Sequence, residues 1–191
     1  MRLFVAMEIP AAVRDNLAAR ICELSKLSSD AIGKPPRWVQ AENLHVTLKF
    51  IGETAPGTLE AIRGALASVR ANKFVDIKCR GLGFFPDDRH PQVLWAGLEA
   101  SANLSRLAKD VDRALETVGV AREKREFTPH LTLARFDPPR LPERLHGAIT
   151  AAAARDFGSF QACEFHLIES KTKPSGAEYT TLHSFAFLAE A

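Results

Sequence analysis

The chain of 191 residues is 46% hydrophobic and 25% charged, and its formal net charge is +2. A globular chain of this size buries enough surface to fold without a disulfide or a structural metal, and the balanced charge argues neither for nor against a nucleic-acid partner. The three cysteines form no CxxC pair, which argues against a disulfide framework and favours a reducing cytoplasm.

The first half of the sequence alternates strand and helix patterns. Apolar residues at every second position predict a strand over 3–9, and Glu8 interrupts a start that is too short for a signal peptide. Pro10 then opens a helix whose apolar residues keep helical spacing through Leu24. The patterns that follow predict a loop at 28–36, a strand at 44–51, a helix at 59–69, a strand at 75–79, a loop at 84–91 and a strand at 93–98.

The second half repeats this alternation of strand and helix patterns. Its patterns predict a helix at 104–118, a strand at 131–136, a short helix at 142–155, and two closing strands at 160–168 and 179–188 around a turn at 171–176. No linker separates the halves, and no apolar run approaches the roughly 20 residues of a membrane span. We therefore expect a single domain over 1–191 of the α+β class. It would have two similar lobes of largely antiparallel sheet, with helices outside and the active cleft between them.

One pattern occurs in both halves: an imidazole and a hydroxyl two residues apart in an apolar run. Side chains at i and i+2 of a strand share a face, so each copy presents His beside Thr and turns its two apolar residues to a core. A single copy would be an ordinary strand in which Thr fits the sheet, but two buried polar pairs need water or a ligand to satisfy them. The copies are His45-Val46-Thr47-Leu48 and His130-Leu131-Thr132-Leu133.

These side chains suit acid–base chemistry on a phosphate. One imidazole of a pair can take a proton from water while the other gives one to the leaving oxygen, and Thr hydroxyls can donate to phosphoryl oxygens. Lys49 and Arg135 follow the two motifs and could add positive charge. By strand alternation Lys49 shares the face of His45, whereas Arg135 does not share that of His130. The alternative for both basic residues is solvated surface.

A zinc site is the main alternative for two convergent histidines. Zinc needs three or four nitrogen, sulfur or carboxylate ligands, and neither motif has another such residue at ligand spacing. Nucleophilic attack by a threonine is a further alternative. The sequence has no GxGxxG, GxxxxGK[ST] or GxSxG motif, so dinucleotide, P-loop and α/β-hydrolase chemistry have no support. We expect no metal and no cofactor.

The two motifs and their flanks resemble the two-histidine (2H) phosphoesterase superfamily, and within it the RNA 2′,3′-cyclic phosphodiesterases long named 2′-5′ RNA ligases. The likeness spans nearly the whole chain. The segments that carry it are 43–52 and 128–135, supported by 2–6, 83–86, 93–98 and by Gly176 with Tyr179.

The resemblance implies a two-lobed fold and metal-independent opening of a 2′,3′-cyclic phosphate to a 2′-phosphomonoester. It assigns His45 as the proton donor to the departing 3′-oxygen and His130 as the base that activates water. Thr47 and Thr132 would hold the phosphate.

Two further residues take roles from the resemblance. Arg135 would contact the phosphate, and Phe50 would help to form the pocket beneath a base. Strand alternation puts both side chains on the faces opposite their histidines, so both assignments require a β-bulge or a strand end. The alternative for Phe50 is a place in the core.

Two other functions stay open at this point. The same groups would serve the joining of RNA ends through a 2′-5′ linkage. A non-catalytic RNA- or nucleotide-binding module would keep the site without turnover, although Arg or Lys in place of either His would suffice for binding alone. The expected partners are RNAs or nucleotides with 2′,3′-cyclic phosphate ends, tRNA fragments among them. We expect a cytoplasmic monomer with no membrane contact.

Overall fold

The computed structural model describes residues 1–28, 34–71, 74–174 and 176–187. The α+β class is confirmed, with helices and strands mixed along the chain. The helices are α1 (Ala11–Lys26), α2 (Leu59–Ala67), α3 (Ala102–Glu116) and α4 (Glu143–Ala151), with short 3-10 turns η1 (Ala41–Asn43) and η2 (Pro56–Thr58). The strands are β1 (Arg2–Glu8), β2 (Arg37–Trp38), β3 (His45–Glu53), β4 (Val75–Phe85), β5 (Val93–Ala100), β6 (His130–Arg135), β7 (Asp156–Ala162), β8 (Glu164–Lys173) and β9 (Gly176–Ala186).

All of these strands belong to one antiparallel sheet, in the order β7-β4-β5-β6-β3-β1-β8-β9, with the short β2 paired to β6. The two motif strands, β6 and β3, stand at the centre, and each has three strands beyond it. In each half a strand, a helix, a motif strand and a second helix follow in chain order. The sheet is therefore built from two similar halves that meet at the motifs.

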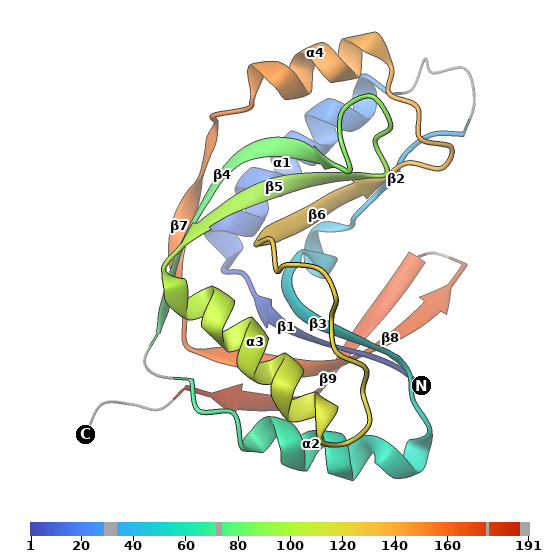
Figure 1. Cartoon of the computed structure of the whole chain (residues 1–191). Coiled ribbons are helices and arrows are strands. Elements are labelled where there is room, and N and C mark those ends of the chain that lie inside the picture. Colours follow the sequence, from blue (N-terminus) through green and yellow to red (C-terminus); the bar gives the residue numbers. More distant parts are fainter. Residues whose placement is uncertain (29–33, 72–73, 175, 188–191) are drawn as a thin grey trace.

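The helices cross over between the halves. α1 packs against β7 and α4, whereas α3 packs against β3 and α2. Figure 1 shows α1 with α4 beside one end of the sheet and α3 with α2 beside the other. The long helix that precedes the motif strand of each half thus covers the other half, which ties the halves together.

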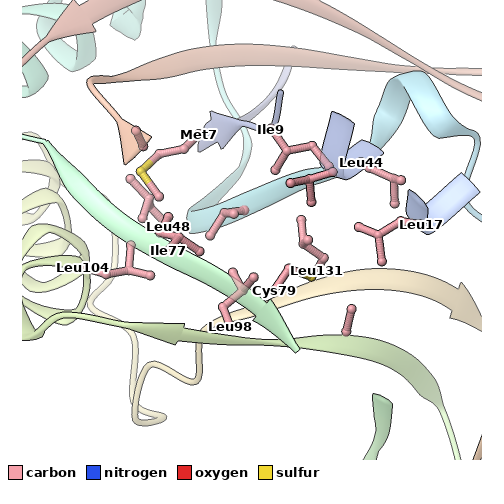
Figure 2. Close-up of a cluster of buried hydrophobic side chains, with 14 of the residues drawn as sticks. Met7, Ile9, Leu17, Leu44, Leu48, Ile77, Cys79, Leu98, Leu104 and Leu131 are labelled. Atoms are coloured by element: carbon pink, nitrogen blue, oxygen red, sulfur yellow. The ribbon is translucent and has the colours of Figure 1, made fainter. Parts of the chain in front are cut away.

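The core fills the space between the two parts of the sheet and the helices. Met7 and Leu48, from β1 and β3, face Ile77 from β4 in Figure 2, while α1 and α3 contribute Leu17 and Leu104. All five side chains are buried in one continuous cluster. Burying a Leu or Ile side chain is worth about 1.5–3 kcal/mol, so this shared core holds the motif strands in place.

Two strand predictions need correction. β4 runs on to Phe85, where the sequence predicted a loop from residue 84, because Phe84 and Phe85 still pair with β5 beyond the register shift near Gly81. The single strand predicted at 160–168 is two strands, since β7 pairs with β4 and β8 pairs with β1 at the other end of the sheet.

The predicted loop at 28–36 lies partly outside the described residues, as do one residue of the predicted turn at 171–176 and the last residue of the strand predicted at 179–188. Over the ranges that the structure describes, no helix is both long and apolar enough to cross a membrane.

Candidate active site

The motif strands β3 and β6 are neighbours, joined by an antiparallel bridge between Val46 and Leu131. This register sets the histidine of each motif opposite the threonine of the other, with all four side chains on one face, here named the site face. Side chains that lie diagonally across two strands are typically about 7–8 Å apart, which is the relation expected for the two histidines. The fold thus brings together the four residues that the sequence singled out.

A β-bulge interrupts each motif strand one residue after the threonine. β1 pairs with Thr47 and then with Lys49, so Leu48 is the extra residue. β5 pairs with Thr132 and then with Ala134, so Leu133 is the extra residue. A bulge reverses the alternation of the side chains beyond it. The residues after each bulge therefore exchange faces relative to the sequence prediction.

Phe50 and Arg135 are moved to the site face by these bulges. Phe50 is 57% exposed and Arg135 is exposed, and Phe50 pairs with Phe4, whose ring lies 6.2 Å from it between centroids. The bulge that both assignments required is present in both strands. Phe50 does not belong to the core.

Lys49 is the residue that strand alternation misplaced. It was expected on the face of His45, as a phosphate contact or as solvated surface, and both expectations are wrong. Lys49 is only 6% exposed, and its Nζ donates to Asp112 Oδ1 at 2.6 Å and to the Ala121 carbonyl at 2.7 Å. Burial acts to raise the pKa of the Asp112 carboxyl. The hydrogen bond from Lys49 opposes this effect and helps to keep that pKa below its usual value. Lys49 fastens β3 to α3 and to the segment that leads to β6.

The two imidazoles are held in the same way. His45 Nδ1 lies 2.7 Å from the Asn43 carbonyl oxygen, and His130 Nδ1 lies 2.7 Å from the Thr128 carbonyl oxygen. A carbonyl only accepts, so Nδ1 carries the hydrogen in both rings. Nε2 is then the nitrogen that can take or give a proton, and both rings have the same tautomer when neutral.

The environment lowers the pKa of both histidines below the usual value. Burial is the largest cause for each, and it is opposed by the hydrogen bond to the backbone carbonyl, which favours the imidazolium. The positive charge of Arg135 lowers the pKa of both, and His130 further lowers the pKa of His45. Arg135 and both rings stand on the site face, as the strand pairing requires. A proton on one ring disfavours a proton on the other.

Aromatic rings surround both imidazoles. Phe4 and Tyr179 lie 4.8 Å and 5.3 Å from His45 between ring centroids, and Phe85 lies 5.0 Å from His130. Phe4 and Phe85 were not singled out by the sequence. Phe4 carried a signal, because it lies between Leu3 and Val5 in a strand that is apolar on both faces, as expected of a strand buried on both sides.

The hydroxyls of Thr47 and Thr132 make no hydrogen bond to another described residue, so both can serve a ligand. Beside His45 a cavity of about 410 Å³ opens between η1 and the start of β9, with Asn43 and Tyr179 in its wall. In the described part of the chain, three or more His, Cys, Asp or Glu side chains nowhere gather as a metal site would require. The site offers imidazole, hydroxyl and guanidinium groups on one face.

Comparison with known proteins shows the family of this chain. The sequence model of the 2′-5′ RNA ligase superfamily matches residues 13–174. The RNA 2′,3′-cyclic phosphodiesterase of Methanothermobacter thermautotrophicus is 33% identical over 97% of this chain and 98% of that protein. The enzyme of the same name from Archaeoglobus fulgidus is 32% identical over 97% of this chain and 99% of its own length.

Solved structures agree with these sequence matches. TT0787 of Thermus thermophilus superimposes with a TM-score of 0.79 and 28% identity over 98% of both chains. Escherichia coli LigT in complex with 3′-AMP gives a TM-score of 0.78 and 25% identity over 98% of both chains. With its paired motifs on the central strands of such a sheet, this chain belongs to the 2′-5′ RNA ligase superfamily of 2H phosphoesterases.

Proposed function

We propose that the protein is an RNA 2′,3′-cyclic phosphodiesterase that hydrolyses 2′,3′-cyclic phosphate ends to 2′-phosphomonoesters. The observation that carries the proposal is the matched pair of imidazoles. Each donates Nδ1–H to a backbone carbonyl at 2.7 Å and keeps Nε2 for the substrate, within the field of one arginine. The names of the relatives agree with this activity.

The reaction needs one neutral and one protonated imidazole. His130 Nε2 takes a proton from water as the water oxygen attacks phosphorus, and His45 gives its Nε2 proton to the 3′-oxygen as the phosphorus–oxygen bond breaks. The products are a 3′-hydroxyl and a 2′-phosphomonoester, with the proton moved from one ring to the other. The 2H resemblance supplies the assignment of donor and base.

A bound phosphate supplies the negative charge that lets one of the two histidines stay protonated. Both histidines have lowered pKa values, so the free site favours two neutral rings near neutral pH. A bound phosphate anion favours the charged form of a neighbouring imidazole and so lets one ring keep a proton. Hydroxyl hydrogen bonds from Thr47 and Thr132 and the charge of Arg135 would then stabilise the negative charge that develops on the phosphoryl oxygens.

Phe50 completes the substrate site in this proposal. An exposed aromatic ring on the site face offers a stacking surface for the base of the terminal nucleotide, and stacking tolerates any base. The partners would accordingly be RNA or nucleotide ends with a cyclic phosphate, tRNA fragments included. We propose catalysis without a metal ion, because imidazole and hydroxyl groups supply the acid, the base and the phosphate contacts. A cytoplasmic location and a monomeric state stay predictions.

The test is turnover of an oligoribonucleotide with a 2′,3′-cyclic end across pH 5 to 8, with EDTA present. We expect conversion to a 2′-phosphate, distinguished from a 3′-phosphate by phosphorus NMR, and a bell-shaped dependence of kcat/KM on pH. Binding without turnover would identify a non-catalytic module instead. Formation of a 2′-5′ linkage from RNA ends in the same assay would show the joining direction.

A further inference from the structure

The site face extends past the two motifs to a second arginine. β2 runs antiparallel to β6, with Arg37 paired to Arg135 and Trp38 paired to Ala134. Val39 N–H then donates to the Leu133 carbonyl at 2.8 Å. Beyond this point η1 leaves the sheet, and the chain returns as β3. β2 and β3 therefore pair with the same edge of β6, one after the other.

The side chain of Arg37 lies on the site face. Residues directly paired in an antiparallel ladder point to the same side, so Arg37 accompanies Arg135. Trp38, the next residue, packs against the core, as alternation requires. Three cross-strand pairs consequently follow one another on this face: Thr47 with His130, His45 with Thr132, and Arg37 with Arg135.

Two guanidinium groups opposite each other are unfavourable without a counter-charge. Like charges at directly paired positions destabilise a sheet. No acidic residue of the described ranges lies within ion-pair distance of Arg37 or Arg135, and the nearby Asp137 pairs with Lys34 at 3.9 Å. Both arginines are exposed. The pair therefore presents two positive charges without an acidic partner in the described ranges, next to the paired motifs.

The arginine pair lies close along the sheet to the nearer histidine. Arg135 lies three residues past Thr132, and a strand rises about 3.3 Å per residue, so the arginine pair lies about 7–10 Å from the pair formed by His45 and Thr132. In the proposed function Arg135 contacts the cyclic phosphate, and its directly paired neighbour Arg37 offers a second guanidinium on the same face.

We propose that Arg37, beside Arg135, binds the phosphate on the 5′ side of the terminal nucleotide. The proposal rests on the proposed function, since it extends the same site by one phosphate. It makes the preferred substrate an RNA end or a 5′-phosphorylated nucleotide rather than a nucleoside cyclic phosphate alone. Arginine suits this task because its planar donors match two phosphate oxygens.

The experiment compares nucleoside 2′,3′-cyclic phosphates of one base with and without a 5′-phosphate, and a dinucleotide that carries a phosphodiester there. For the parent protein, the ratio of kcat/KM with to without the 5′-phosphate should exceed one. In Arg37→Gln this ratio should fall about tenfold, as expected for the loss of a hydrogen bond between charged groups. Arg106→Gln, on an exposed position of α3, removes the same charge away from the site face and should keep the ratio of the parent.

A ratio is insensitive to the fraction of folded protein, so poor folding of the variant does not imitate the effect. The salt dependence gives a second readout, because each lost phosphate contact to a single strand should lower the slope of log affinity against log salt by about 0.7. An unchanged ratio in Arg37→Gln would overturn the proposal.

If the parent turns over none of the three substrates, the proposed function fails and the arginine site is judged by binding. The inactive double variant His45→Ala/His130→Ala should still bind the 5′-phosphorylated nucleotide more tightly than the unphosphorylated one. Adding Arg37→Gln should abolish that preference, and a preference that survives would end the proposal.

Discussion

The strands β3 and β6 have the same local structure and different surroundings. Both show the same order of buried and exposed residues over six positions, and both bulge at the leucine that follows the threonine. Both histidines donate Nδ1–H to the carbonyl two residues earlier. After the bulge the strands differ: Lys49 and Phe50 stand in β3 where Ala134 and Arg135 stand in β6. In the proposed function the shared part supplies the acid–base groups, and the part that differs would decide how a substrate lies between them.

A site with two equivalent halves would accept a cyclic phosphate in either orientation. An aromatic ring at one of the equivalent positions and a guanidinium at the other would remove this ambiguity, because in the proposed function a base stacks on Phe50 and an anion pairs with Arg135. Departures from the two-fold arrangement are therefore where substrate selection is expected, whereas the repeated residues carry the chemistry.

Removing either histidine should have the largest effect. His45→Ala and His130→Ala should each lower kcat by about 10²–10⁴-fold, the usual contribution of a positioned acid or base. Steady-state kinetics with a cyclic-ended oligoribonucleotide measure this. His90→Ala is the matched control, because His90 is exposed in the loop between β4 and β5. Full activity in either motif variant would contradict the role of the pair.

Arg135→Gln tests the guanidinium of the asymmetric position. We expect kcat to fall about 10²-fold, the scale seen when one donor to a developing negative charge is lost. The charge of Arg135 lowers the pKa of His45 and of His130, so both pKa values should rise in the variant. NMR titration of the imidazole protons checks the direction. Arg2→Gln, which removes a charge that influences Tyr179 but neither histidine, should leave both titrations in place.

Lys49→Met tests the second difference between the strands, a buried lysine in β3 at the position of Ala134 in β6, and its effect is on stability. The variant leaves the Ala121 carbonyl without its ammonium donor, and the half-buried Asp112 carboxylate keeps only Arg122 and the Glu123 N–H as partners. Breaking a buried pair costs about 3 kcal/mol or more when it leaves a charge uncompensated, so with Arg122 still present we expect a loss below about 3 kcal/mol, measured as the free energy of unfolding in urea. The double variant Lys49→Met/Asp112→Leu should recover much of this loss, since it removes both charges. Equal stability of the two variants would show that the pair contributes no such coupling.

Phe50→Ala should have a smaller effect, confined to substrate binding. Because the ring is 57% exposed, its loss should change stability by less than about 0.5 kcal/mol. Loss of one stacked base should raise KM for the oligoribonucleotide about tenfold. Phe74→Ala is the control, since Phe74 is 47% exposed and lies before β4. Equal KM values in the two variants would place the base elsewhere.

The local pattern of the motifs was predictable, and the effect of their bulges was not. Alternation correctly placed Val46 and Leu131 in the core and both histidines on the opposite face. It failed at Lys49, because a bulge arises from pairing with β1 and leaves no mark in the strand's own sequence. The resemblance placed Phe50 and Arg135 where alternation alone would not.

The other features that the sequence did not predict depend on strand pairing between distant parts of the chain. The paired position of Arg37 depends on a two-residue strand that forms only against β6. The separation of β7 from β8 depends on partners at opposite ends of the sheet, since both segments read as strand. Phe4 and Phe85 reach the histidines from strands whose register no local pattern gives.

The smallest expected effect is the dependence of stability on pH, and it compares the two strands once more. Both histidines have a lower pKa in the folded protein than the ordinary value of about 6.5 that the unfolded chain keeps. The unfolded state therefore binds more protons as the pH falls below about 6.5, and stability is lost through the lowered folded pKa. Urea unfolding at several values from pH 8 to 5 measures this loss of stability.

The variants His45→Gln and His130→Gln should each flatten the curve of unfolding free energy against pH. Burial is the largest cause of the lowered pKa in both rings and their electrostatic coupling is mutual, so the two variants should flatten the curve in the same direction. A curve as steep in both variants as in the parent would assign the pH dependence to groups away from the motifs.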